Sequence, residues 1–337
     1  MMLFLLLAAA GPVPPGAPHP SPLKLYKDWT VGCDNGRACH AVALMPQDGE
    51  GVTMGLRRGP EAEAPVEIDF TLDGAGAAGL AADGKKLPVH LVSTSDGTKL
   101  PPADAPAVIA ALRSAHSLTL LDAKGASLGD VSLAGTSAAL LYMDDQQKRV
   151  GTVTALARPG PQPASAVPPP PAIPVVHAAP DASGPALALT AARVAALRKE
   201  QGCRIEDVGG PAEIERYRLD SERTLVLLSC GSGAYNLTMV PLIARLAGSN
   251  VAIELPKFDA PQDWWTDGRP ELINAEWDPK SGTLSSFSKG RGIGDCGVTQ
   301  NYVWDGARFR LVSQEEMGEC RGSLDYITTW RAKVVGR

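Results

Sequence analysis

A proline-rich stretch between residues 158 and 185 constrains this fold more than any other feature of the sequence. It begins RPGPQP and continues to four consecutive prolines at 168–171. Such a stretch cannot build sheet ladders and is extended and semi-rigid. We therefore predict a linker at 158–185 that holds apart an N-terminal domain at 21–157 and a C-terminal domain at 186–337. A ligand for a partner's aromatic groove is the alternative reading of the linker.

The first 20 residues have the features of an export signal. An apolar run at residues 3–10, LFLLLAAA, is followed by Gly, Pro and Ala, which fits a cleavage site near Ala10. No Lys or Arg precedes the run, which departs from the usual pattern, and a buried N-terminal strand or helix is the alternative. The run is too short to cross a membrane, because a membrane-spanning helix needs about 20 apolar residues. We expect a signal peptide and leader at 1–20, a periplasmic or secreted protein, and no membrane span after signal removal.

The six cysteines predict disulfide bonds, which form in the same oxidising compartment. Two precede the linker and four follow it, so each domain can pair its own. Four cysteines permit three connectivities, and we favour sequential pairing: Cys33 with Cys39, Cys203 with Cys230, and Cys296 with Cys320. Zinc bound by Cys33, Cys39 and His40 is less favoured, because five residues separate the cysteines and the C-terminal domain contains no histidine. We predict no metal and no cofactor.

Short apolar segments between Gly, Pro and Asp predict a β-rich N-terminal domain. Alternation at residues 23–31 indicates a strand, and Asn35-Gly36 indicates a reversal after it. A three-residue loop there would place Cys33 opposite Cys39. Two helices are expected, at 104–115 with Asp104 as N-cap and at 137–149 with Thr136 or Ser137 as N-cap. Further strands are expected at 52–56, 66–72, 89–92 and 117–122.

The C-terminal domain is predicted to begin with a helix at 190–201, capped by Thr190 and ended by Gly202. Strands then recur about every ten residues, as in an antiparallel sandwich or meander. We predict a mostly β fold of two such domains. The strands are expected at 224–230, 234–243, 250–255, 272–277, 284–288, 299–304, 307–312 and 326–334.

One hairpin can be predicted in register. A two-residue turn at Asp305-Gly306 would place Trp304 opposite Ala307 and Tyr302 opposite Phe309. One face then carries four large side chains, which we interpret as core. An exposed platform for stacking sugars is the alternative. The four are Tyr302, Trp304, Phe309 and Leu311.

Two segments are candidates for ligand binding. Lys289 and Arg291 lie in the glycine-rich KGRGIGD segment, whose backbone N–H groups could hold an anion, or which is simply a tight loop positioned by Cys296. Trp264 and Trp265 lie in a loop that could form a contact surface.

No catalytic residue is predicted from the sequence. Carboxylate pairs such as Asp263 with Asp267, or Asp144 with Asp145, could in principle perform acid–base chemistry. The SCGSG segment at 229–233 lacks the spacing of a nucleophile elbow, and no histidine lies in its domain to act as a base. The near-balanced charge, formally −5, disfavours nucleic acid as a partner.

Several segments resemble the domain of unknown function 1176 family of secreted proteobacterial proteins. They are 27–35 (KDWTVGCDN), 135–155, 289–297 (KGRGIGDCG) and 302–322. The resemblance covers nearly the whole chain outside the linker and implies a Gram-negative source. The N-terminal domain is also similar, more weakly, to invasion-associated locus B proteins, which share a Trp before a Cys and a second Cys soon after. That likeness implies envelope or host contact, and neither family supplies catalytic residues.

We therefore expect an exported, non-enzymatic envelope or protein-interaction module whose partner is an envelope or host protein or a glycan. A hydrolase of cell-envelope material that uses acidic residues is one alternative. An inhibitor of an envelope-directed enzyme is another. A convergent acidic pair in a deep pocket would favour the hydrolase, whereas an exposed rigid loop or apolar patch would favour binding or inhibition.

Overall fold

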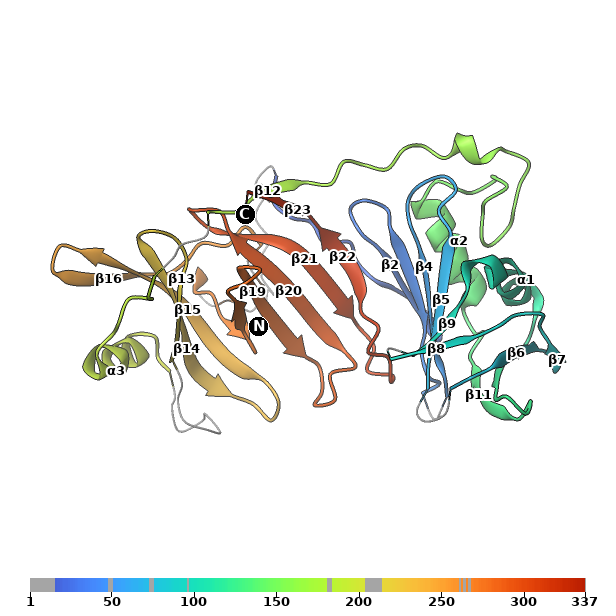
Figure 1. Ribbon diagram of the computed structural model, residues 1–337, viewed down its shortest axis with the longest axis horizontal. Coiled ribbons are helices and arrows are strands. Elements are labelled where there is room, and N and C mark those ends of the chain that lie inside the picture. Colours follow the sequence, from blue (N-terminus) through green and yellow to red (C-terminus); the bar gives the residue numbers. More distant parts are fainter. Residues whose placement is uncertain are drawn as a thin grey trace, which may run out of the picture.

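The protein is mostly β, as predicted, with a few short helices (Figure 1). The first 15 residues of the predicted signal lie outside the described part of the chain, and so do Trp264, Asp263 and Asp267. The structure, a computed structural model, describes residues 16–47, 51–72, 76–95, 97–180, 184–203, 214–260, 262, 265 and 268–336.

The N-terminal half, residues 16–157, is built on a seven-stranded antiparallel sheet ordered β1-β2-β3-β4-β5-β9-β8. Alternate residues point to opposite faces of a strand, and one face carries Trp29, Leu56 and Phe70 into the core. The strands are β1 (Lys24–Tyr26), β2 (Trp29–Cys33), β3 (Cys39–Ala43), β4 (Thr53–Arg58), β5 (Val66–Thr71), β8 (Val92–Thr94) and β9 (Gly97–Leu100).

A smaller sheet and two helices cover that core face. The sheet has the order β11-β10-β6-β7 and contributes Leu80, Leu118 and Leu120 to the core. The elements are β6 (Gly79–Ala82), β7 (Lys85–Lys86), the 3-10 turn η1 (Pro102–Asp104), α1 (Ala105–Ser114), β10 (Leu118–Leu121), β11 (Ser127–Val131) and α2 (Thr136–Gln146).

The C-terminal half, residues 186–336, contains two antiparallel sheets with a shared core. The first sheet has the order β13-β14-β15-β16, with β17 also paired to β15, and α3 covers its outer face through Val194 and Leu197. Its elements are α3 (Ala191–Glu200), β13 (Ile214–Arg218), β14 (Arg223–Ser232), β15 (Leu237–Ala247), β16 (Asn250–Glu254) and β17 (Leu272–Ile273).

The second sheet of the C-terminal half is the continuous meander β18-β19-β20-β21-β22. Its inner face carries Tyr302, Trp304, Phe309 and Leu311, all buried, so the prediction that these four side chains form core is confirmed. Its strands are β18 (Glu276–Asp278), β19 (Thr283–Lys289), β20 (Gly297–Trp304), β21 (Phe309–Met317) and β22 (Ile327–Arg331).

The proline-rich stretch lies along the molecule from α2 to the C-terminal strand (Figure 1). It contains the 3-10 turn η2 (Ala164–Ala166) and then β12 (Val175–His177), which pairs in parallel with β23 (Lys333–Val335). It does not hold the two halves apart. β22 packs on β2 and β3, and Val42 and Leu44 share an apolar cluster with Met317 and Ile327. Apolar residues on the outer face of the seven-stranded sheet favour this contact.

The three disulfides join Cys33 with Cys39, Cys203 with Cys230, and Cys296 with Cys320, which confirms sequential pairing. Cys33 and Cys39 are direct partners across the first hairpin, as predicted. The loop between them holds three residues, because Asp34 pairs with Ala38. Arg37, not Gly36, takes the left-handed conformation, with φ +65°.

Two local predictions about strands are wrong. The strand expected at 23–31 is divided into β1 and β2 by a turn at Lys27, which has φ +55°. The later hairpin pairs Trp304 with Phe309 rather than with Ala307, because the Asp305 carboxylate accepts hydrogen bonds from the N–H groups of Ala307 and Arg308 and moves the turn one residue along. This two-residue shift in register leaves every side chain on its predicted face.

The N-cap residue was predicted correctly for two helices of three, and its side chain forms the capping hydrogen bond in one of them. The Thr190 hydroxyl accepts a hydrogen bond from the Arg193 N–H at 3.2 Å, and Gly202, at φ +66°, follows the end of α3. The N-cap of α2 is Gly135 rather than Thr136 or Ser137, and the Thr136 hydroxyl donates back to the Leu133 carbonyl. Asp104 is the N-cap residue of α1, as predicted, but its carboxylate accepts a hydrogen bond from the His90 N–H rather than from the helix.

Candidate functional site

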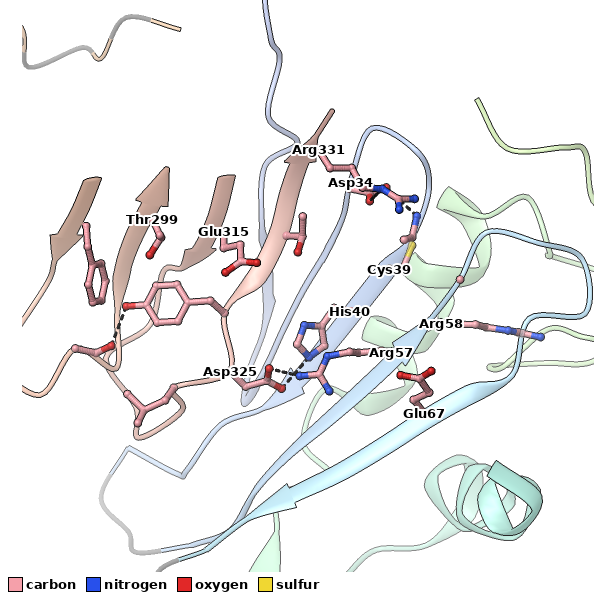
Figure 2. Close-up of a pocket in the computed structure, with 17 residues that line it drawn as sticks. Asp34, Cys39, His40, Arg57, Arg58, Glu67, Thr299, Glu315, Asp325 and Arg331 are labelled. Carbon is pink, nitrogen blue, oxygen red and sulfur yellow. Dashed lines mark hydrogen bonds and ion pairs between the residues drawn. The ribbon is translucent and has the colours of Figure 1, made fainter. Parts of the chain in front are cut away.

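A cleft of about 740 Å³ lies between the two halves and takes residues from both (Figure 2). One wall is the outer face of the seven-stranded sheet, and the other is the face of the β18–β22 sheet that points away from the C-terminal core. We call this space the interdomain cleft.

Each wall of the interdomain cleft presents a row of cross-strand neighbours. On the N-terminal wall, Arg57 is paired on one side with His40 and on the other with Glu67. These side chains face the cleft because the alternate positions, such as Leu56 and Ile68, point into the core. The opposite wall carries the row Phe287, Thr299, Glu315 and Thr328 on β19 to β22.

At the base of the cleft, Asp325 joins the two halves. Its carboxylate lies 2.9 Å from His40 Nε2, and the Arg57 guanidinium pairs with both Asp325 and Asp69. Gly55 leaves room for this arrangement, since a Cβ at that position would lie 2.5 Å from an Asp325 oxygen and 2.9 Å from an Asp69 oxygen. We call these four side chains, His40, Arg57, Asp69 and Asp325, the Asp325 network.

The electrostatics of the Asp325 network favour a charged Asp325 carboxylate. Burial disfavours the ionised Asp325, but its hydrogen bond with His40 and the charges of His40 and Arg57 outweigh burial and lower its pKa. Burial also disfavours the charged Arg57, whereas Asp325 and Asp69 more than compensate and raise its pKa. Asp325 is therefore an ion-paired anion rather than a proton donor at neutral pH.

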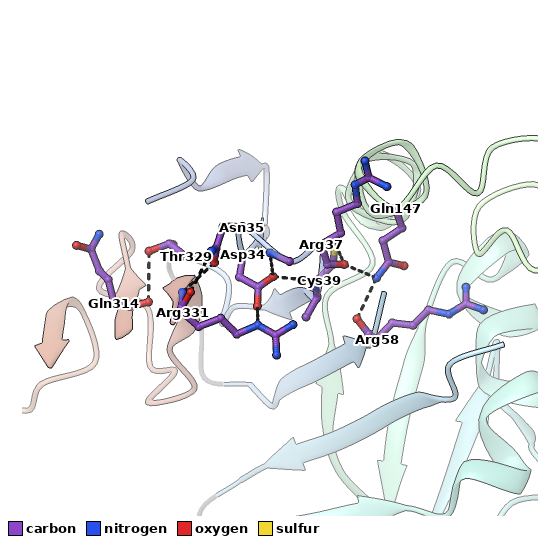
Figure 3. Close-up of polar contacts among 11 residues, drawn as sticks. Asp34, Asn35, Arg37, Cys39, Arg58, Gln147, Gln314, Thr329 and Arg331 are labelled. Carbon is purple, nitrogen blue, oxygen red and sulfur yellow. Dashed lines mark hydrogen bonds and ion pairs between the residues drawn. The ribbon is translucent and has the colours of Figure 1, made fainter. Parts of the chain in front are cut away.

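A second polar contact closes the cleft near the first hairpin (Figure 3). Asn35 and Arg331 exchange two hydrogen bonds of 2.9 Å, from the Asn35 amide to the Arg331 carbonyl and from the Arg331 N–H to the Asn35 side-chain oxygen. The Arg331 guanidinium forms an ion pair with Asp34. On the other side of the hairpin, the Gln147 amide donates to the carbonyls of Arg37 and Arg58 at 3.0 Å.

Two carboxylates on the cleft walls are not engaged in this way. Glu67 is exposed and Glu315 is half-buried, and within the described residues neither forms an ion pair or a side-chain hydrogen bond. The aromatic part of the cleft consists of Phe287 and Tyr326, whose rings meet edge to face at 5.8 Å. The Tyr326 hydroxyl donates to the Gly294 carbonyl at 2.9 Å, and burial raises the pKa of Tyr326 to about 12.

The glycine-rich loop singled out in the sequence forms part of the rim of the cleft. Arg291 is paired with the buried carboxylate of Asp295, which also accepts from the Gly322 N–H at 2.7 Å. The Lys289 ammonium lies 5.5 Å from the centre of the Phe287 ring. Gly290 packs directly on the disulfide, since a Cβ there would lie 2.6 Å from Cys296 Sγ. The loop is thus tight and disulfide-positioned.

The other candidate residues lie away from the cleft. Trp265 is half-buried, donates to the Glu271 carbonyl at 2.7 Å, and meets the Phe258 ring edge to face. Asp144 is buried and accepts from the N–H groups of Leu156 and Ala157, so it holds the chain that follows α2. Asp145, its neighbour, is exposed.

The proposed zinc ligands Cys33 and Cys39 are consumed by their disulfide. In the described ranges, no three His, Cys, Asp or Glu side chains group as metal ligands would.

Sequence reasoning missed the main polar residues of the cleft. His40 was considered only as a zinc ligand, and Arg57, Glu67, Glu315 and Asp325 were not considered. Alternation in β3 to β5 could have placed His40, Arg57 and Glu67 on one face. Their position opposite Asp325 could not be read in this way, because 285 residues separate His40 from Asp325.

Comparison with known proteins gave a family match and a sequence relative. Residues 23–333 match the family described as protein of unknown function (DUF1176). An uncharacterized protein of Escherichia coli K12, YpfG, is 32% identical over 322 residues, which cover 86% of this chain and 86% of that protein. No solved structure matches this chain.

Proposed function

This chain belongs to the DUF1176 family, and from that premise we propose that it is an exported, non-enzymatic binding module of the Gram-negative cell envelope. Its ligand would occupy the interdomain cleft. The observation that carries the proposal is that both halves build the walls of this one cleft. An aromatic corner faces it, together with carboxylates that have no ion pair among the described residues. Concave sites with a few convergent polar groups are where proteins usually bind ligands.

Export is supported by the disulfides. All six cysteines are paired, and such bonds persist in oxidising compartments such as the periplasm. The apolar run at residues 3–10 is typical of a signal peptide. No helix in the described ranges is long and apolar enough to span a membrane.

A cleft-blocking variant tests the binding proposal. The chain from Ser21 onward would be produced in the periplasm, and its thermal unfolding measured with muropeptides, envelope oligosaccharides and short peptides. A probe present at about a hundredfold its Kd stabilises the protein by about 2.7 kcal/mol. Thr299→Trp, in the cleft wall, should abolish that shift, whereas Thr283→Trp, on the same sheet outside the cleft, should preserve it. A shift that survives Thr299→Trp contradicts the proposal.

Hydrolysis of cell-envelope material is the second candidate. It is favoured by one observation, that Glu67 and Glu315 face the same cleft from opposite walls. Paired carboxylates can act as acid and base or as acid and nucleophile. Release of dye from labelled peptidoglycan, abolished by Glu67→Gln or Glu315→Gln, would establish this candidate. If the protein binds a ligand in a manner that Thr299→Trp abolishes but releases no dye, it is a binding module and not a hydrolase.

A further inference from the structure

Among the charged side chains of the described residues that line the interdomain cleft, the arginines are already engaged by other groups of the protein, whereas two carboxylates are not. Arg57 is held between two carboxylates, and Arg331 pairs with Asp34. The Arg58 guanidinium points away, donating to the carbonyls of Ala64 and Thr154. Glu67 and Glu315 keep unpaired carboxylates within the described residues. In the part of the chain that the structure describes, Lys289, whose ammonium lies beside Phe287, is the one cation to set against these two carboxylates, so the charge that remains for a ligand is negative.

An independent observation shows that the aromatic corner accepts a cation. The face of Phe287, a lining residue, is already occupied by an ammonium group, that of Lys289 at 5.5 Å. Cations bind aromatic faces because the ring quadrupole is negative there. Leu324, which is 67% exposed, adds apolar surface to the same cleft, where an alkyl chain could pack.

We propose that the interdomain cleft binds an organic cation, an ammonium or guanidinium group on an aliphatic chain. Glu315 and Glu67 each offer a carboxylate to a cationic group, one from each wall of the cleft, and Phe287, Tyr326 and Leu324 cover the chain. This inference rests on the proposed function, because it names the ligand class of the same cleft. Among the described residues, an anionic ligand would meet two unpaired carboxylates and arginines that are already paired or turned away, against the single ammonium of Lys289 beside Phe287. A free polyamine and a Lys or Arg side chain of a peptide share this chemistry.

Calorimetric titration at low salt tests the charge of the ligand. The probes are spermidine and cadaverine, the peptides Ala-Lys-Ala and Ala-Arg-Ala, neutral pentanediol, and anionic glutarate. We expect the cationic probes to bind and the other two not to bind. Binding confined to polyamines indicates a free amine as the natural ligand, whereas binding of the peptides indicates a basic side chain.

Three variants locate the cation. Glu67→Gln and Glu315→Gln should each weaken binding by about two- to fivefold, as expected for loss of one ion pair that is open to solvent. The matched control is Glu276→Gln, on the same sheet as Glu315 but outside the cleft, and it should leave affinity unchanged. Lys289→Gln should strengthen binding about two- to threefold, because it removes a competing cation from the Phe287 ring. Circular dichroism of each variant verifies its fold.

The sign of the Lys289 effect separates this inference from the anion site considered in the sequence, since loss of Lys289 would weaken binding of an anion. Neutral or anionic probes that bind in a manner sensitive to Thr299→Trp would overturn the cation inference and leave the cleft as the binding site. Failure of every probe, cationic or not, to bind at the cleft would remove the proposed function as well.

Discussion

At the scale of single residues, Asp325 carries more of the site than any other side chain. It accepts from His40 and pairs with Arg57, so it connects β3 and β4 to the loop before β22. A carboxylate that satisfies two partners in a partly buried place is difficult to replace, because its removal leaves both partners unpaired.

Asp325→Asn is expected to lower the unfolding free energy by about 2 kcal/mol at pH 7. The reason is the loss of the anion that neutralises Arg57 and holds His40. Urea denaturation followed by tryptophan fluorescence measures the change. Asp145→Asn is the control, since that carboxylate is exposed, lies 4.0 Å from the Lys148 ammonium and accepts an exposed hydrogen bond from the Gln146 amide at 3.1 Å, so its substitution should cost less than about 0.5 kcal/mol. Equal effects of the two substitutions would contradict the central role of Asp325.

The charge of Asp325 also gives its contribution a pH dependence. Because the folded state lowers its pKa, the carboxylate stabilises the protein above its unfolded pKa of about 4. That stabilisation is lost as the pH falls through the folded pKa. The difference in stability between the wild type and Asp325→Asn should therefore shrink below about pH 4.

Glu316 offers a prediction of opposite sign. It lies on β21 beside Glu315 but on the other face, and burial alone raises its pKa. Protonation thus favours the folded state, a contribution present below about pH 4.5 and lost as the pH rises through the folded pKa. Glu316→Gln should stabilise the protein at pH 7 by up to about 1 kcal/mol, and this gain should vanish at pH 4. Urea denaturation at both pH values measures the difference in stability between Glu316→Gln and the wild type. An equal difference at pH 7 and pH 4 would contradict the prediction.

At the scale of elements, close contacts position the strands and helices that support the cleft. The start of α2 touches β1 at Gly135, which has φ +103°. A Cβ there would lie 1.8 Å from the Tyr26 carbonyl oxygen, so only glycine lets the helix approach the strand. α2 in turn packs on β2 and β3, the strands that carry the first hairpin.

Gly135→Ala is expected to destabilise the protein by about 3 kcal/mol or prevent folding, because the added carbon would separate α2 from β1. The control is Gly125→Ala, where φ is also positive, at +84°, but the added carbon meets no atom within 4 Å. That control should cost only about 1 kcal/mol. Thermal unfolding of the two variants would show similar losses if backbone strain rather than the close contact determined the effect.

At the scale of the whole molecule, the two halves are joined through their surfaces and not only through the linker. The Arg321 guanidinium reaches Asp28 at 2.6 Å and the Met45 carbonyl at 2.7 Å. The apolar cluster around Val42 and Ile327 lies beside these contacts. The geometry of the interdomain cleft therefore depends on this interface.

Cleavage of the linker should leave the halves associated. A protease site in place of the exposed prolines 168–171 would cut the chain without touching the interface residues. We expect the two fragments to elute together in gel filtration at micromolar concentration, since the apolar and ion-pair contacts persist. Addition of Arg321→Ala and Asp325→Asn should weaken their association. Separation of the unsubstituted fragments would show that the linker alone holds the halves together.

The sequence by itself determined what depends on near neighbours: the β-rich class, the Cys33–Cys39 pair, the cap of α3 and the core faces of the strands. Alternation, the short spacing of those two cysteines and capping chemistry act over a few residues, so they can be read from the chain. Even there, a local prediction was wrong. Turn propensity alone placed Trp304 opposite Ala307, but hydrogen bonds to the Asp305 side chain shift the register by two residues, so that Trp304 pairs with Phe309.

Only the tertiary structure decided the contact between the halves and the cleft that results. Glu67 and Glu315 belong to different sheets, and no periodicity relates one to the other. The proline-rich stretch was expected to separate the halves, but the apolar residues Val42, Leu44 and Ile327 are buried by bringing them together. The physical reason is that the hydrophobic effect is non-directional. The geometry of the contact is therefore set by the shapes of both packed faces and not by either half alone.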